Sequence, residues 1–160
     1  MKYIAILSVL VLIVTLVGVG YLYMTANIVV EAVGIIATDA PSQEALFNEL
    51  KAQVRLGAVV GTPYVPDMEL SDPEDYQFYT YTVRLKNNCT VPADMVELQI
   101  TPMAGDILQI GSSADVKLPA GQTVDATATI LTSKDMHAIR EVSITYYIWG
   151  VPFSMKTTVK

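Results

Sequence analysis

The stretch from Tyr3 to Met24 contains no charged residue, and this run constrains the chain more than any other feature. A helix of about 20 apolar residues crosses a hydrocarbon core of ~30 Å. In lipid a single span must be helical despite many Val and Ile residues, because each backbone N–H needs a partner within the segment. Tyr3, Tyr21 and Tyr23 stand at its two ends, as interfacial aromatic residues do. We therefore predict a transmembrane helix within residues 1–26, with residues 3–24 in the lipid bilayer.

The alternative interpretation of this run is a cleaved signal peptide. The apolar core of a signal peptide has about 7–15 residues, and cleavage needs small residues shortly before the cut. Cutting after Ala26 would place Met24 at one of those positions, so we expect an uncleaved signal anchor. Lys2 is positive on one flank, whereas the first charge on the other flank is Glu31. This asymmetry predicts a cytoplasmic N-terminus in the cell membrane and a C-terminal domain outside.

Composition narrows the function of the part that follows. The chain has a net charge of −6 and is 52% hydrophobic. An acidic balance argues against a nucleic-acid partner, because phosphates require a basic face, and the apolar content argues against disorder. Cys89 is the only cysteine, so no intrachain disulfide forms. We expect residues 27–160 to form one extracytoplasmic domain without a cofactor.

The patterning of this domain is mainly that of β-strands. Residues 27–37 are rich in branched side chains, as expected of a strand, and a last strand is predicted over residues 153–159. Alternation predicts four further strands, with these inward-facing residues: Tyr79, Tyr81, Val83 and Leu85; Val96, Leu98 and Ile100; Val124, Ala126, Ala128 and Ile130; and Val142, Ile144, Tyr146 and Ile148. The fold class is therefore a mainly β sandwich of seven or eight strands.

One helical pattern interrupts the strands, over residues 41–56. Its apolar stripe consists of Leu46, Phe47, Leu50 and Val54, spaced as on one helix face. Such a stripe packs on the edge or end of a sheet. A partner-binding helix is the alternative.

Four segments carry a resemblance to a known class of modules. Residues 83–88, 91–93 and 96–98 resemble the strand–turn–strand of immunoglobulin-like or fibronectin-III-like β-sandwich modules of membrane-anchored envelope proteins, and residues 118–123 resemble the next element. Membrane-anchored late-embryogenesis-abundant-like β-domains show the same order and are the alternative. The resemblance implies an immunoglobulin-like β-sandwich without a catalytic site, from which the inserted helix departs.

An acidic segment is the candidate metal site. Its carboxylates are Asp67, Glu69, Asp72, Glu74 and Asp75. Calcium requires several converging oxygen ligands, but the usual Asp-rich loop with its glycine is missing. We interpret the segment as a solvated loop and keep calcium as the alternative.

Catalysis has little support in the residues. His137 is the only histidine, and no Gly-x-Ser-x-Gly elbow accompanies it. A pair of Cys89 with His137 has no local signature, and zinc would lack ligands. We expect a protein that is not an enzyme.

Aromatic side chains supply the binding candidates. Alternation places Phe78, Tyr147 and Trp149 on the polar faces of their strands, where rings can anchor a partner. We expect a non-enzymatic, single-pass surface protein whose sandwich binds an envelope protein or a membrane complex. The alternative is a carbohydrate-binding module for cell-wall or surface glycan, which would need two or more coplanar exposed rings.

Overall fold

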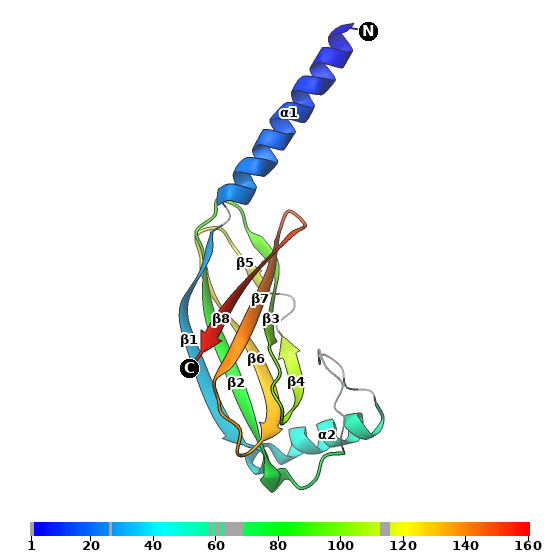
Figure 1. Ribbon diagram of the computed structural model, residues 1–160, viewed down its shortest axis with the longest axis vertical. Coiled ribbons are helices and arrows are strands. Elements are labelled where there is room, and N and C mark those ends of the chain that lie inside the picture. Colours follow the sequence, from blue (N-terminus) through cyan, green and yellow to red (C-terminus); the bar gives the residue numbers. More distant parts are fainter. Residues whose placement is uncertain (1, 26, 58, 60–61, 63–68, 113–115) are drawn as a thin grey trace.

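A long N-terminal helix projects from one end of a β-sandwich in the computed structural model (Figure 1). The structure describes residues 2–25, 27–57, 59, 62, 69–112 and 116–160. The helix α1 spans Lys2–Thr25, and β1 begins at Ile28. Tyr3–Thr25 is the helix, among the described residues, that is long and apolar enough to cross a membrane.

Two four-stranded antiparallel sheets make up the sandwich, with the orders β1-β2-β6-β4 and β5-β3-β7-β8. The strands are β1 (Ile28–Asp39), β2 (Tyr76–Asn87), β3 (Ala93–Ile100), β4 (Asp106–Ser112), β5 (Val116–Leu118), β6 (Thr123–Ser133), β7 (Arg140–Ile148) and β8 (Val151–Val159). The mainly β prediction is thus confirmed, with eight strands in the described part of the chain. The last strand begins earlier than predicted, because Pro152 pairs with Tyr147 on an edge strand, where proline is tolerated.

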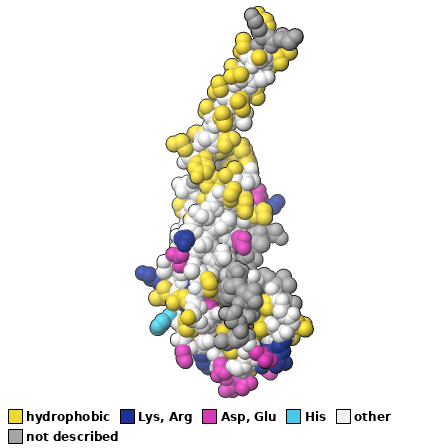
Figure 2. Space-filling model, turned by 45° about the vertical axis from the view of Figure 1, so that its right-hand side comes forward, with side chains coloured by type: hydrophobic (Ala, Val, Ile, Leu, Met, Phe, Trp, Pro, Cys, Tyr) yellow, Lys and Arg dark blue, Asp and Glu magenta, His cyan; other side chains and the backbone are white. Residues whose placement is uncertain are grey.

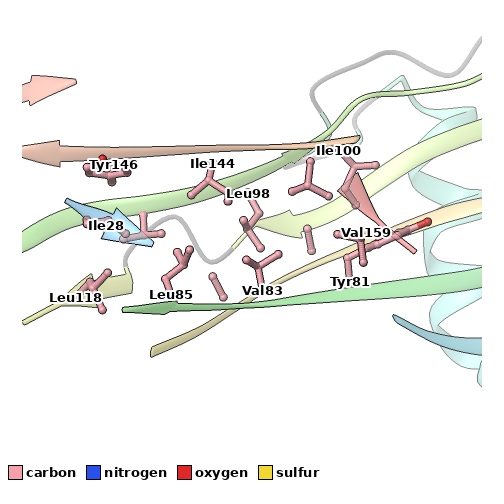
Figure 3. Packing of buried hydrophobic residues seen from close by; sticks show 14 of the residues in the cluster. Ile28, Tyr81, Val83, Leu85, Leu98, Ile100, Leu118, Ile144, Tyr146 and Val159 are labelled. Carbon is pink, nitrogen blue, oxygen red and sulfur yellow. The ribbon is translucent and has the colours of Figure 1, made fainter. Parts of the chain in front are cut away.

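The core lies between the two sheets (Figure 3). Tyr81, Val83 and Leu85 of β2 face Leu98 and Ile144 of the other sheet, and all five are almost fully buried. The inward-facing sets predicted from alternation are buried, except that Val124 is only partly so. Period-two alternation therefore identified the faces that pack together, as expected when each strand has one buried side.

A second apolar cluster covers part of the opposite face of the first sheet. The predicted helix consists of a 3₁₀ turn (Ala40–Gln43) and α2 (Glu44–Arg55). Phe47 and Leu50 of α2 pack with Phe78 of β2 and Leu131 of β6. Phe78 and Leu131 lie opposite each other on the two paired strands. The helix thus closes the end of the sandwich far from α1 (Figure 1), and the prediction that its stripe packs on the sheet is confirmed.

A buried ion pair joins the two sheets. Arg140 begins β7 in one sheet and Asp106 begins β4 in the other. Arg140 donates from Nη2 to Oδ1 at 2.7 Å and from Nε to Oδ2 at 3.0 Å, with both side chains fully buried. Its Nη1 donates to the carbonyls of His137 and Ile139. Although burial lowers the pKa of Arg140, the hydrogen bonds and charge of Asp106 raise it above its ordinary value.

Tyrosine hydroxyls extend this polar cluster beneath the β6–β7 connection. Tyr79 donates to the carbonyl of Met136 and Tyr81 to that of Ala138, at 3.0 and 2.7 Å. Burial raises the pKa of Tyr81 to about 12, although the charge of Arg140 opposes the rise. The polar cluster therefore holds the β6–β7 connection in place through hydrogen bonds to its backbone carbonyls, and its charged pair is buried.

Breaking the ion pair on one side should strongly destabilise the domain. Arg140→Met leaves the Asp106 carboxylate buried without its partner, which costs about 3–5 kcal/mol. The double variant Asp106→Leu with Arg140→Met leaves no buried charge at the pair, so its free energy of unfolding should fall by less. Urea unfolding of residues 27–160 measures both. A double variant less stable than the single one would contradict this account.

Candidate functional site

The turn between β7 and β8 carries the most exposed of the predicted binding residues. Trp149 is 67% exposed and lies, with Gly150, between the paired residues Ile148 and Val151. Both turn residues have positive φ, 51° for Trp149 and 76° for Gly150. A two-residue turn of this kind favours Asn-Gly, and a bulky residue is strained there. We call Trp149, Gly150 and Val151 the hairpin tip.

The hairpin tip lies beside the last turns of α1. Trp149 and Val151 line a groove of about 140 Å³ together with Val19, Leu22 and Tyr23 of the helix. The prediction that Trp149 lies on the surface is confirmed. However, its neighbour is the apolar helix α1. Because more than 120 residues separate the two in the sequence, local patterns could not predict this contact.

An aromatic contact attaches the hairpin to the helix. The rings of Tyr23 and Phe153 lie 5.2 Å apart, and Phe153 stacks on Tyr146 at 5.6 Å. Tyr146 is buried in the core between the sheets. A continuous contact therefore runs from the helix through β8 into the core.

The prediction that Phe78 is available to a partner is wrong. Phe78 is 1% exposed. Alternation correctly placed it on the face opposite to Tyr79, but Phe47 and Leu50 of α2 cover that face at this point. Because the periodicity of a strand identifies a face without showing what covers it, the sequence could not exclude Phe78.

Tyr147 and Trp149 do not form a joint ring surface. Tyr147 is half-buried. The ring contacts of the described residues are Tyr23–Phe153, Phe47–Tyr76, Tyr79–Tyr81 and Tyr146–Phe153. The side-by-side pair that a glycan site requires is therefore not formed by these two residues.

The described part of the acidic segment, residues 69–75, lies at the end of the domain far from α1. Asp67 lies outside the described residues. Glu69 pairs with Arg55 at 2.7 Å, and Asp75 accepts a hydrogen bond from Ser71. Glu69, Asp72, Glu74 and Asp75 are exposed, and no three metal-binding side chains converge among the described residues.

Cys89 and His137 lie at opposite ends of the sandwich. Cys89 lies two residues after the end of β2, and its Sγ accepts a hydrogen bond from the backbone of Asn27 at 3.1 Å. His137 is exposed (Figure 2). It follows Met136, whose carbonyl accepts a hydrogen bond from Tyr79 near the start of β2. The two side chains are not brought together.

A second surface, which the sequence analysis missed, lies along β1. This strand has β2 on one side and, in the described part of the chain, no paired strand on the other. Val33 is 40% exposed and Ile36 63% exposed. We call Ala32, Val33, Gly34 and Ile36 the β1 edge. Its sequence signal is the pair Ile35-Ile36, which places one apolar side chain on each face of the strand.

Paired charges border the β1 edge. A shallow groove runs from Ala32 and Gly34 to Arg84 and Asp125. Arg84 donates two hydrogen bonds to Asp125, at 2.7 and 2.8 Å. Hydrogen bonding by Arg84 lowers the pKa of Asp125, so this exposed carboxyl is ionised and neutralised by its neighbour. The groove therefore offers backbone and apolar groups beside a compensated ion pair.

Comparisons with known proteins return similar crystal structures but no family. No family model and no curated protein matches the chain. It is similar to the GAE domain of yeast GGA1, at 11% identity and a TM-score of 0.38, covering 56% of this chain and 94% of that one. It is also similar to a FixG-related protein from Vibrio parahaemolyticus, at 10% identity and a TM-score of 0.33, covering 51% and 76%. At these scores neither structure assigns a function.

Two substitutions in the β7–β8 hairpin should separate surface from core. Trp149→Asn should change the unfolding free energy of residues 27–160 by less than about 0.5 kcal/mol or raise it, because asparagine tolerates positive φ. Tyr146→Ala should cost about 3 kcal/mol as a large-to-small change in the core. Thermal and urea unfolding measure both. A Trp149→Asn domain that unfolds would show that the ring is part of the core.

Proposed function

We propose that this chain is a single-pass, membrane-anchored surface protein whose β-sandwich binds another protein of the cell envelope. The membrane anchor is α1, the N-terminus is cytoplasmic and the sandwich lies outside the cell. The β1 edge is the binding surface for the protein partner. This function needs no catalytic group and no cofactor.

The observation that carries the proposal is the exposed apolar surface of α1. None of the span Tyr3–Thr25 is buried in the structure. Ile4, Leu10 and Val17, from successive parts of the helix, are 70, 57 and 66% exposed. A helix that is apolar all round must be buried in a core or in lipid, and the domain does not bury it. Lipid is therefore the environment that satisfies this surface.

The first test is the topology of the full chain. A reporter fused after Lys160 should be accessible from outside intact cells, because Lys2 keeps the N-terminus inside. The mature chain should retain its full length on intact-mass measurement. A mature chain that starts near residue 27 would identify the segment as a cleaved signal peptide and would remove the anchor from the proposal.

The β1 edge supports a protein partner because its backbone is available for pairing. An edge strand presents unpaired N–H and C=O groups, and an extended peptide can add to it as a further strand. β1 has 12 residues, and Val33 and Ile36 add exposed apolar side chains to that edge. Proteins commonly protect such edges with charge, but the segment from Ala32 to Thr38 has none. This combination favours an extended protein segment as the occupant.

The second test uses a site-specific crosslinker at Ala32 in intact cells. We expect a discrete crosslinked product that disappears in the variant Val33→Lys with Ile36→Lys, because charges on an edge oppose strand addition. The matched control is Leu56→Lys, which charges an 80% exposed apolar residue at the far end of the domain. The product should persist in the control. Loss in both variants, or in neither, would place the binding surface elsewhere.

The glycan alternative has weaker support from the geometry. It requires coplanar exposed rings with polar neighbours, whereas Trp149 faces the groove beside α1 and Tyr147 is half-buried. The protein-binding proposal therefore stands first.

A further inference from the structure

The connection between α1 and the sandwich is short, which holds the domain close to the helix. The helix ends at Thr25 and β1 begins at Ile28. The backbone of Asn27 accepts a hydrogen bond from Asn88 at 3.0 Å and donates to the sulfur of Cys89. The start of the domain is thus tied to the end of β2, and the sandwich cannot move far from the end of the helix.

The hairpin tip reaches past this connection and lies along the helix itself. The groove between them is lined by Val19, Leu22 and Tyr23 from α1 and by Trp149 and Val151 from the hairpin. At ~1.5 Å per residue, Tyr3 and Tyr23 stand ~30 Å apart along the helix, which matches the thickness of a hydrocarbon core. Trp149 therefore lies at the level of the outer boundary of the bilayer, the region that tryptophan and tyrosine prefer.

The chemistry of the hairpin fits this position. Residues 142–155 carry no charge, and residues 3–30 carry none either. Trp149 and Val151 are nevertheless 67% and 40% exposed within the protein. Figure 2 shows hydrophobic side chains continuing from the helix onto the adjacent end of the sandwich, whereas charged side chains gather at the opposite end. The apolar hairpin is thus at the end of the sandwich that lies next to the helix.

We propose that the hairpin tip inserts into the interface of the lipid bilayer beside α1, so that the domain contacts the membrane at a second point. The ligand is the boundary between headgroups and acyl chains. This inference rests on the proposed membrane anchor. The left-handed backbone of Trp149 supports it, since strain at a bulky turn residue persists where the side chain serves a function.

The lining of the groove argues for lipid as its occupant. It consists of apolar and aromatic residues without a charge: Val19, Leu22, Tyr23, Ile148, Trp149, Val151 and Phe153. Apolar acyl chains suit such a lining, and tryptophan and tyrosine prefer the boundary between acyl chains and headgroups.

The test uses Trp149 as its own probe, because it is the only tryptophan in the chain. The full chain is reconstituted in phosphatidylcholine vesicles whose acyl chains are brominated near the carbonyl end or near the methyl end. Trp149 should lose most of its fluorescence with bromine near the carbonyl end and less with bromine near the methyl end. Its emission should lie at shorter wavelength than that of tryptophan in water. Iodide added in the aqueous phase should quench this emission only weakly.

The matched control moves the tryptophan to the opposite end of the domain. In the variant Trp149→Asn with Leu56→Trp, asparagine suits the turn, and the new ring replaces an 80% exposed residue. Its fluorescence should be quenched by iodide and not by brominated lipid. This result also shows that the domain lies on the outer side of the vesicle.

Three results would overturn the inference. A separate assay tests the proposed anchor, so that its failure can be distinguished from failure of the inference. If iodide quenches Trp149 as strongly as the control, the tip is in water. If neither quencher reaches it, protein covers the tip. If the shielding disappears when the protein is diluted in excess lipid, that protein is a second copy. Flotation with the vesicles and resistance to alkaline extraction test α1 alone, so loss of both would instead overturn the proposed membrane anchor.

Discussion

Burial of one apolar face of each sheet against the other holds this molecule together. Tyr81, Leu85, Leu98 and Ile144 meet between the sheets with almost no exposed surface. Burial of apolar area is the dominant favourable term in folding, so the alternation of each strand follows from this contact. The same contact leaves two outer faces and the sheet edges to be satisfied in other ways. The inserted helix covers part of one outer face, and the β1 edge is without a paired strand in the described part of the chain.

The two ends of the sandwich differ in chemistry because they have different neighbours. At the end far from α1, α2 covers the outer face, and the connection before Arg140 is fixed by buried polar groups. Charged residues are concentrated there, as in the pair of Arg55 with Glu69. At the end near α1 the hairpin carries no charge and packs on the helix through Phe153. A domain with one polar and one apolar end has a preferred orientation at a boundary between water and lipid.

The two candidate surfaces have separate physical requirements and therefore separate roles. The hairpin tip presents Trp149 and Val151 at the level of the helix end, where the proposed anchor would place an amphipathic ring in the membrane interface. The β1 edge presents backbone groups with Val33 and Ile36 on the side of the domain, where an extended peptide can pair. A domain held close to the bilayer by both helix and hairpin would present that edge at a fixed height, within reach of other membrane-bound proteins.

The sequence by itself determined the apolar helix, the inward-facing residues of the strands and the apolar stripe of the inserted helix. These features depend on local periodicity and on charge, which are read from neighbouring residues. Only the tertiary structure decided that α2 buries Phe78, that Trp149 lies beside Val19 and Tyr23, and that β1 lies at an edge. It also paired Arg140 with a carboxylate that lies 34 residues away in the sequence. Periodicity identifies which face of a strand is apolar, but what covers that face depends on how distant segments meet, and that is set by packing of the whole chain.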